Sequence, residues 1–137
     1  MGPSDLSEYT VTVDVLATEK RRQMGNAGVI AQRYALVLFG NHQRLELYPW
    51  VAEDKRTVKK DFAWEPDTWY RVKLQVENLD DGTTRAQGKV WPVSEPEPSE
   101  WTLEKIDPIP NLQGSPGIYA DAPAEIFFDN LEVKHNP

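Results

Sequence analysis

Apolar and polar side chains alternate strictly along several stretches of this sequence. The clearest run is Trp69–Glu77, where four apolar residues alternate with four charged or amide residues. Because successive side chains of a strand point to opposite faces of its sheet, this period of two predicts a strand with one buried and one solvated face. Tyr9–Leu16 shows the same pattern. The residues of the two runs predicted to face the core are Tyr9, Val11, Val13, Val15, Tyr70, Val72, Leu74 and Val76.

Further strand-like runs follow at intervals of about 8 to 12 residues, which is typical of β-sandwiches and jelly rolls. Turn residues such as Gly40-Asn41 and Asp80-Asp81-Gly82 separate them. We therefore predict an all-β antiparallel sandwich, or jelly roll, of about ten strands without significant helix. A chain of 137 residues suits one domain, residues 1–137. The other expected strands are Ala27–Gln32, Tyr34–Phe39, Gln43–Tyr48, Thr57–Phe62, Thr84–Trp91, Trp101–Ile106, Gly114–Ala120 and Ala124–Val133, with charged or Pro-rich loops at Glu19–Gly25 and Val93–Ser99.

The last strand is predicted to close the sandwich against the N-terminal run. Its apolar residues share one face only if the alternation slips by one residue near Asp129-Asn130, which predicts a β-bulge there. A closing strand needs a partner, and the expected partner is Tyr9–Val15. The residues that would then face the core are Ile126, Phe128, Leu131 and Val133.

Charge and composition exclude several classes of protein. The net charge of −7 argues against a nucleic-acid partner, because such binding draws its affinity from positive charge placed against phosphates. The absence of cysteine excludes disulfides and thiolate metal sites but does not fix the compartment. The longest uncharged apolar run, Ala35–Phe39, is too short to cross a bilayer, so we expect no membrane partner.

The C-terminal Gly114–Tyr119, followed by Phe127–Val133, resembles the end of a concanavalin A-like (laminin-G/glucanase-type) jelly roll. Further segments resemble the middle of the same domain, so the likeness extends over nearly the whole chain. This architecture serves lectins, carbohydrate-binding modules, glycosidases and interaction domains alike, so it implies a fold more than an activity. The segments similar to the middle of the domain are Trp69–Leu74, Lys89–Pro92, Glu97-Pro98 and Trp101.

The chain is most similar to the C-terminal module of bacterial PQQ-type repeat β-propeller proteins, a likeness that includes Gln32-Arg33-Tyr34 and Asn41–Leu45. This resemblance implies a module of a larger protein with a β-propeller domain as a partner. It also implies a periplasmic or extracellular location, with any export signal outside this segment.

Polar and aromatic residues on the outward faces of three central strands suit a sugar. An aromatic ring can cover the apolar C–H face of a pyranose, while charged and amide groups hydrogen-bond its hydroxyls. A solvent-facing sheet shows the same alternation without any ligand, so the pattern alone leaves both interpretations open. The predicted ligand-binding residues, on the concave sheet face and adjacent loops, are Arg33, Tyr34, Arg44, Glu46, Tyr48, Trp50, Gln87, Lys89 and Trp91.

Catalytic and metal-binding motifs are weak in this sequence. Glycosidases of this fold place carboxylates two residues apart on one strand. Glu95 and Glu97 have that spacing but lie in a Pro-rich loop, and no catalytic residue is predicted. Related jelly rolls often carry Ca²⁺, and Asp129 with its neighbouring carbonyls is the metal ligand to test.

Three functions follow from these observations, in order of preference. The first is a non-catalytic, lectin-like carbohydrate-binding module that recognises a polysaccharide or oligosaccharide. The second is a structural or protein-interaction domain of a secreted multidomain protein. The third is a relative of the glycoside hydrolases, which the missing carboxylate spacing disfavours.

Overall fold

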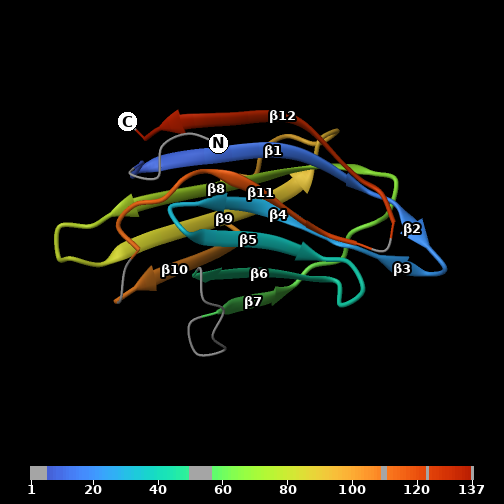
Figure 1. The fold of residues 1–137 in the computed structure, drawn as a ribbon, viewed down its shortest axis with the longest axis horizontal. Coiled ribbons are helices and arrows are strands. Elements are labelled where there is room, and N and C mark those ends of the chain that lie inside the picture. The colour runs from blue at the N-terminus through green and yellow to red at the C-terminus, as the bar shows by residue number, and fades with distance from the viewer. Residues whose placement is uncertain (1–5, 50–56, 109–110, 123, 137) are drawn as a thin grey trace.

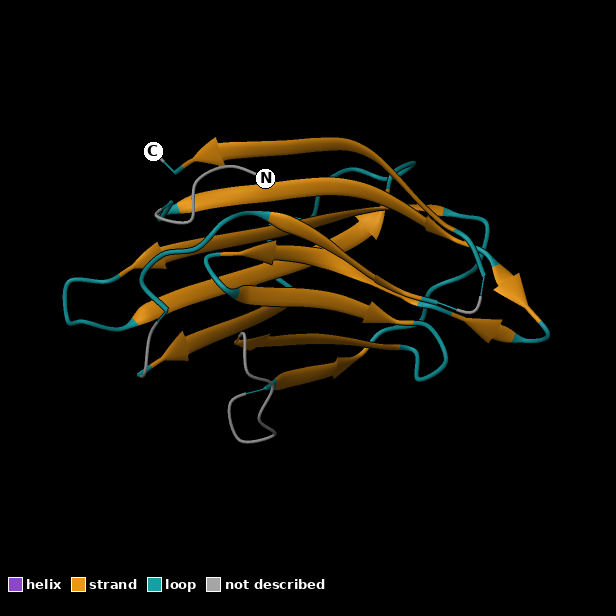
Figure 2. Cartoon of the chain, viewed as in Figure 1, coloured by secondary structure: helices purple, strands orange, loops and turns teal. Residues whose placement is uncertain are grey.

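The computed structural model describes residues 6–49, 57–108, 111–122 and 124–136. They form two five-stranded antiparallel sheets stacked face to face, with a two-stranded hairpin at one end (Figures 1 and 2). This arrangement confirms the predicted all-β sandwich. The described residues contain no helix long and apolar enough to cross a membrane. The strands are β1 (Tyr9–Ala17), β2 (Glu19–Lys20), β3 (Gln23–Met24), β4 (Asn26–Ala31), β5 (Tyr34–Phe39), β6 (Arg44–Pro49), β7 (Val58–Asp61), β8 (Trp69–Asn78), β9 (Thr84–Pro92), β10 (Leu103–Asp107), β11 (Gly117–Asp121) and β12 (Ile126–His135).

The first sheet has the strand order β10-β9-β8-β1-β12. β8 and β9 form a hairpin in which Leu74 lies opposite Gly88. The N-terminal β1 lies between β8 and the C-terminal β12, so the two ends of the chain are neighbours (Figure 1). The predicted pairing of the last strand with the first is therefore confirmed.

A bulge interrupts the pairing of β12 with β1. The register shifts by one residue between Thr12 and Asp14, so that Asn130 and Leu131 both lie opposite Val13. Asn130 has a φ of 54°, in the left-handed region that asparagine tolerates better than most residues. The bulge confirms the predicted slip in alternation.

The second sheet has the order β11-β4-β5-β6-β7. Strands β4 to β7 follow one another as hairpins, and β11 joins the edge beside β4. Gln32 and Arg33 connect β4 to β5 with φ values of 51° and 64°. Two successive positive φ angles define a type I′ turn, whose twist matches that of the strands it joins. This turn places Arg33 at one end of the sheet.

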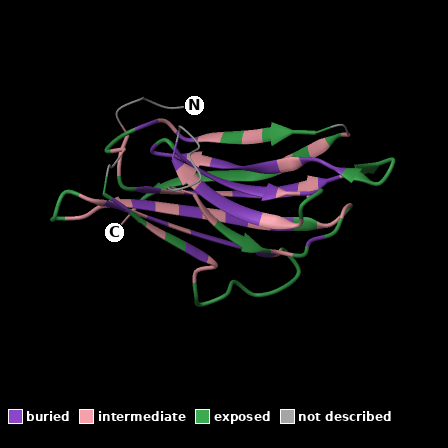
Figure 3. Cartoon of the chain, turned by 90° about the horizontal axis from the view of Figure 1, so that it is seen from below, coloured by how far each residue is buried: buried purple, intermediate pink, exposed green. Residues whose placement is uncertain are grey.

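The core lies between the two sheets, where Figure 3 shows the buried residues along the strands. All eight core residues predicted from β1 and β8 are at most 5% exposed, which confirms the alternation. On β12, Ile126 and Phe128 pack against the core, whereas Leu131 and Val133 are both 40% exposed because β12 is a sheet edge. The second sheet contributes to the core mainly Val29, Leu36, Leu38, Leu45 and Leu47.

The segment predicted as a charged loop, Glu19–Gly25, contains the β2–β3 hairpin instead. Arg21 and Arg22 form its turn, with φ values of 53° and 65°. Strands of two residues are too short to show an alternation, so the sequence pattern could not reveal them.

Candidate functional site

A hollow of about 290 Å³ lies on the outer face of the second sheet, the face turned away from the first sheet. In the register of the sheet, the small Ala35 of β5 lies between Ile30 of β4 and Tyr48 of β6. A short side chain between two long ones leaves a depression, because cross-strand neighbours stand side by side on one face. The residues lining the hollow are Ile30, Arg33, Tyr34, Ala35, Tyr48 and Tyr119.

Tyr48 and Tyr119 give the hollow its aromatic surface. Tyr119 comes from β11, where it lies opposite Gly28, and Tyr48 comes from β6. Burial, together with the electrostatic influence of Tyr119 and Glu46, raises the pKa of Tyr48 to about 12. The Tyr48 hydroxyl is therefore protonated at neutral pH and can both donate and accept a hydrogen bond.

Arg33 supplies the charge at the hollow from the β4–β5 turn. The Asn111 side-chain amide donates a hydrogen bond of 2.9 Å to the Arg33 carbonyl, which fixes the backbone. Gly114 packs so closely that a Cβ placed there would lie 2.8 Å from Arg33 Cγ. The guanidinium is exposed and makes no hydrogen bond or ion pair with the part of the chain that the structure describes.

Arg44 and Glu46 stand on the same outer face as Tyr48, as the alternation of β6 predicts. The Arg44 Nε lies 2.9 Å from Glu46 Oε2, and the Arg44 guanidinium is 5.9 Å from the centre of the Phe39 ring. Glu46 is only 7% exposed, and Arg44 balances the charge of its carboxylate. This ion pair lies beside the hollow without lining it.

Tyr34 borders the hollow but is a buried core residue. Its hydroxyl donates to Asp107 Oδ2 at 2.7 Å and accepts from the Asn111 backbone N–H at 3.0 Å. Burial raises the pKa of Tyr34 well above its ordinary value, and Asp107 raises it further. Since its polar atom is already used and its side chain lies in the core, Tyr34 supports the β4–β5 turn from inside the sandwich.

Two groups of predicted binding residues remain. Trp50 lies outside the described residues. Gln87, Lys89 and Trp91 belong to β9 in the first sheet, on the opposite side of the sandwich from the hollow. The prediction of one polar surface across the three central strands is therefore wrong, because β6 belongs to the other sheet. Alternation identifies outward residues but does not say which sheet a strand joins.

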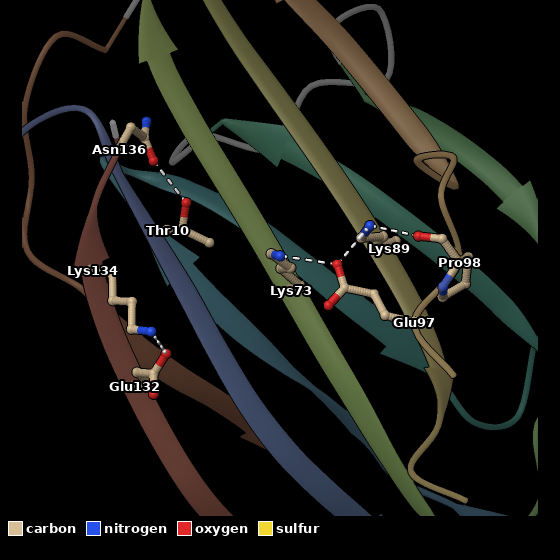
Figure 4. Close-up of polar contacts among 8 residues, drawn as sticks. All are labelled: Thr10, Lys73, Lys89, Glu97, Pro98, Glu132, Lys134 and Asn136. Carbon is tan, nitrogen blue, oxygen red and sulfur yellow. Dashed lines mark hydrogen bonds and ion pairs between the residues drawn. The ribbon is translucent and has the colours of Figure 1, made fainter. Parts of the chain in front are cut away.

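The connection after β9 also covers part of this opposite face. We call residues 93–100 the strap. The Glu97 carboxylate of the strap accepts hydrogen bonds from Lys73 Nζ at 3.0 Å and Lys89 Nζ at 2.8 Å (Figure 4). Lys89 Nζ also donates to the Pro98 carbonyl at 2.7 Å. Glu97 thus fastens the strap to two neighbouring strands, and these contacts hold the pKa of its carboxyl below the usual range, with the Lys89 bond as the main cause.

Lys89 and Trp91 are consequently closed to a ligand. They are 5% and 4% exposed, respectively. The Lys89 ammonium lies 4.7 Å from the ring centre of Trp101 and 5.9 Å from that of Trp91, so both rings contact a cation of this chain. The alternation correctly places these side chains outward, but the strap buries them.

The predicted calcium ligand Asp129 is an exposed residue of β12. Its Oδ1 accepts the Asn130 backbone N–H at 2.8 Å. Its cross-strand neighbour Asp14 is held by Arg71 at 2.7 Å and by the Asn130 side-chain amide at 2.7 Å. Among the described residues no group of three or more His, Cys, Asp or Glu could hold a metal ion. Calcium at Asp129 stays a prediction.

Three residues that shape the hollow were not predicted. Ile30 and Ala35 belong to apolar runs that look fully buried in the sequence, so their outward direction gives no signal. Tyr119 lies in the short run Gly117–Ala120, whose residue types do not show which face its ring takes. Its position beside β4 depends on a pairing between distant segments, which alternation does not specify.

No protein-family model and no curated protein matches this chain. Several solved structures match it. The chain is similar to a doubly substituted variant of human galectin-16, with a TM-score of 0.62 and 10% sequence identity over 99% of this chain and 94% of that one. It is also similar to sheep galectin-11 in complex with glycerol, with a TM-score of 0.63 and 10% identity over 94% of this chain and 92% of that one. A singly substituted variant of human galectin-16 gives a TM-score of 0.60 at 10% identity over 98% of this chain and 92% of that one.

These neighbours confirm the concanavalin A-like part of the resemblance, whereas the link to PQQ-type repeat proteins has no support among them. At 10% identity the likeness extends to the fold alone. The chain therefore has the galectin-type β-sandwich jelly roll.

Proposed function

We propose that this chain is a non-catalytic, lectin-like module that binds a poly- or oligosaccharide in the hollow of the second sheet. The observation that carries the proposal is the combination of two tyrosine rings, a small Ala35 floor and a fixed, exposed Arg33 in one depression. The galectin-type fold of the whole chain supports it.

The chemistry of a sugar ring fits this combination. A pyranose presents an apolar C–H face and a rim of hydroxyls, and tyrosine offers an apolar ring face with a polar hydroxyl at its tip. Tyr48 and Tyr119 can cover the C–H face, while the Tyr48 hydroxyl and the Arg33 guanidinium are available to the sugar oxygens. The adjoining Arg44–Glu46 pair offers donors and acceptors to a second sugar unit along the face.

The cellular setting belongs to the same proposal. We place the module outside the cytoplasm, attached to a β-propeller domain of a larger protein, on the resemblance of Gln32-Arg33-Tyr34 and Asn41–Leu45 alone. Mass spectrometry of the native protein that contains this chain, recovered from fractionated cells of its source, tests this part: the peptides should extend into a β-propeller domain and should come from the fraction outside the cytoplasm.

The binding proposal is tested on a glycan array with the wild-type chain and the variants Tyr48→Ala and Tyr119→Ala. Each variant removes one ring from the hollow without touching the core, so the fold should be retained. Loss of an aromatic contact in a ligand site is expected to weaken binding about tenfold, and the double variant should lose retention.

The matched control is Gln75→Ala, which removes a polar side chain from the outer face of β8 on the opposite side of the sandwich. It should leave glycan binding unchanged. Equal loss in Gln75→Ala and Tyr48→Ala would move the site away from the hollow. A folded wild-type chain that binds no glycan on the array would contradict the proposal and favour the protein-interaction domain.

A further inference from the structure

The hollow is unbalanced in charge. Of the residues that line it, Arg33 is cationic and none is acidic. Glu46 stands on the same face but is already paired with Arg44 at 2.9 Å. The Arg33 guanidinium therefore brings one uncompensated positive charge to a largely apolar, aromatic depression.

The cations on the opposite face are arranged differently. Arg71 is bound to Asp14 at 2.7 Å and Lys73 to Glu97 at 3.0 Å, while Lys134 lies 3.1 Å from Glu132 (Figure 4 shows the lysine pairs). Each of these ammonium or guanidinium groups has a carboxylate of this chain beside it. Arg33 has no such partner among the described residues, although the whole chain carries a net charge of −7 and is rich in carboxylates.

The backbone that carries Arg33 is also fixed before any ligand arrives. Both residues of its type I′ turn have positive φ, and the turn is tied down by Asn111 and by Tyr9, whose hydroxyl accepts the Gln32 N–H at 2.7 Å. The Tyr9 hydroxyl in turn donates to the Gly114 carbonyl at 2.6 Å. A ligand would therefore meet a backbone that needs little ordering, which lowers the entropic cost of binding.

We propose that the hollow selects carboxylated sugars, such as hexuronic or sialic acids, over neutral ones. The sugar ring lies against Tyr48 and Tyr119, and its carboxylate meets the Arg33 guanidinium. The planar guanidinium fork matches a carboxylate in shape as well as charge, and an apolar surrounding strengthens the pair relative to open water. This inference rests on the proposed sugar-binding function and names the substrate class of the same site.

The test compares glycans in matched pairs that differ only at the carboxyl group, which is charged in one member and neutral in the other. Oligosaccharides ending in glucuronic, galacturonic or N-acetylneuraminic acid are each measured beside the methyl ester of the same sugar, by calorimetry or biolayer interferometry. We expect the acids to bind at least about tenfold more tightly than the esters, as is usual for a charge-assisted hydrogen bond. Raising the ionic strength should reduce this preference, because Arg33 is exposed and its charge is screened by salt.

The variants Arg33→Gln and Arg33→Lys assign the preference to one side chain. Arg33→Gln should abolish the preference, so that the ratio of the affinities for acid and ester falls to about one. Arg33→Lys should keep part of the preference, because it retains the charge but loses the fork. Arg21→Gln is the matched control, because it removes the same charge from the exposed turn of the β2–β3 hairpin, outside the hollow. Unchanged melting temperatures show that the variants fold.

The outcomes separate this inference from the function on which it rests. Equal binding of acids and esters overturns the charge selection and leaves the sugar-binding proposal standing. A preference for acids that survives in Arg33→Gln also overturns the inference, because another group must then read the carboxylate. No binding of either member of any pair overturns both.

Discussion

The two outer faces of this sandwich both carry charged and aromatic side chains. They differ in whether the charges are paired within the chain and in whether the surface is covered. On the first sheet, charged side chains are neutralised within the chain, and Glu97 and Pro98 of the strap bind Lys89. On the second sheet, a small residue opens an aromatic hollow and an arginine at its rim has no acidic partner among the described residues. In the sequence, β6 of the second sheet looks like β8 and β9 of the first, a strand with a polar outward side.

The first-sheet face also has a depression, of about 310 Å³, along β12, β1 and β8. It forms where Thr10 and Thr12 stand between longer side chains. Its charged side chains are paired within the chain, Lys73 with Glu97 and Lys134 with Glu132, and the Thr10 hydroxyl donates to the Asn136 side-chain oxygen at 2.7 Å (Figure 4). A cavity of similar size is therefore not sufficient for a site. What distinguishes the hollow is the pairing of apolar rings with an unsatisfied charge.

Filling the hollow should have the largest effect. Ala35→Leu places a branched side chain on the floor between Ile30 and Tyr48, where it occupies the space of the sugar without entering the core. We expect the affinity for a glycan identified on the array to fall about 100-fold, about 2.7 kcal/mol of binding free energy. Isothermal titration calorimetry measures the loss.

The counterpart on the other face is Thr12→Leu, which fills the depression along β1. It should leave glycan affinity within error of the wild type. If Thr12→Leu lost affinity and Ala35→Leu kept it, the sugar would bind on the first sheet, which contradicts the proposed site.

The second effect concerns the link between the two sheets. The Tyr9 hydroxyl of β1 bonds the Gln32 N–H at 2.7 Å and the Gly114 carbonyl at 2.6 Å, and so joins the first sheet to the turn that carries Arg33. Tyr9→Phe leaves both backbone groups without this partner in a buried place. The expected cost is about 2 kcal/mol of unfolding free energy, measured by urea denaturation.

The same variant should also weaken binding of acidic sugars, because the backbone of Arg33 loses an anchor. Tyr70→Phe is the control, since its hydroxyl accepts the Glu65 N–H far from this turn. A stability loss in Tyr9→Phe with fully retained selectivity for acids would show that the turn is held by its other contacts.

The third effect tests the strap. Lys89→Met keeps the apolar stem but removes the ammonium from Glu97, Pro98 and the Trp101 ring. Because Glu97 retains Lys73 and is partly solvated, we expect a loss of only about 1 to 2 kcal/mol in unfolding free energy. Faster hydrogen exchange in residues 93–100, with unchanged glycan affinity, is the expected signature.

A drop in glycan affinity in Lys89→Met would contradict the division of the sandwich into a binding face, the outer side of the second sheet, and a closed face, the outer side of the first sheet. Arg85→Met on the same strand is a suitable comparison, because its guanidinium pairs with Glu77 and does not contact the strap.

The sequence was sufficient for the longer strands, for the inward residues of β1 and β8 and for the bulge in β12, because each of these depends on neighbours along one strand. It was not sufficient for Leu131 and Val133, which were expected in the core and are 40% exposed at the sheet edge. Arg33 and Tyr48 could likewise be predicted from residue type and local position. The pairing between strands that lie far apart in the sequence could not be predicted. That is why Tyr119 was missed, since it reaches the hollow only through the pairing of β11 with β4.

Because alternation does not reveal tertiary contacts, Lys89 and Trp91 were wrongly grouped with the residues of the hollow. Lys89 and Trp91 point outward as alternation requires, yet the strap covers them and their sheet lies on the other side of the core. A chain segment that folds back over a polar face leaves no mark in the period-two pattern, since its contacts are tertiary.

The smallest expected effect is the pH dependence of the closed face. Burial alone would raise the pKa of Asp14, but hydrogen bonds from Arg71 and Asn130 and the charge of Arg71 outweigh it and lower the pKa below its ordinary value. A folded-state pKa below that of the unfolded chain means that this contribution to stability is present above the unfolded pKa, near 4, and is lost as the pH falls through the folded value. Because Arg71 is partly exposed, the contribution should not exceed about 1 kcal/mol.

In urea titrations between pH 7 and pH 2, Asp14→Asn should therefore be less stable than the wild type at pH 7, and the two curves should converge in acid. Parallel curves would mean that the Asp14–Arg71 pair contributes nothing through its charge, and the closed face would then be held by the strap and the strand pairing alone.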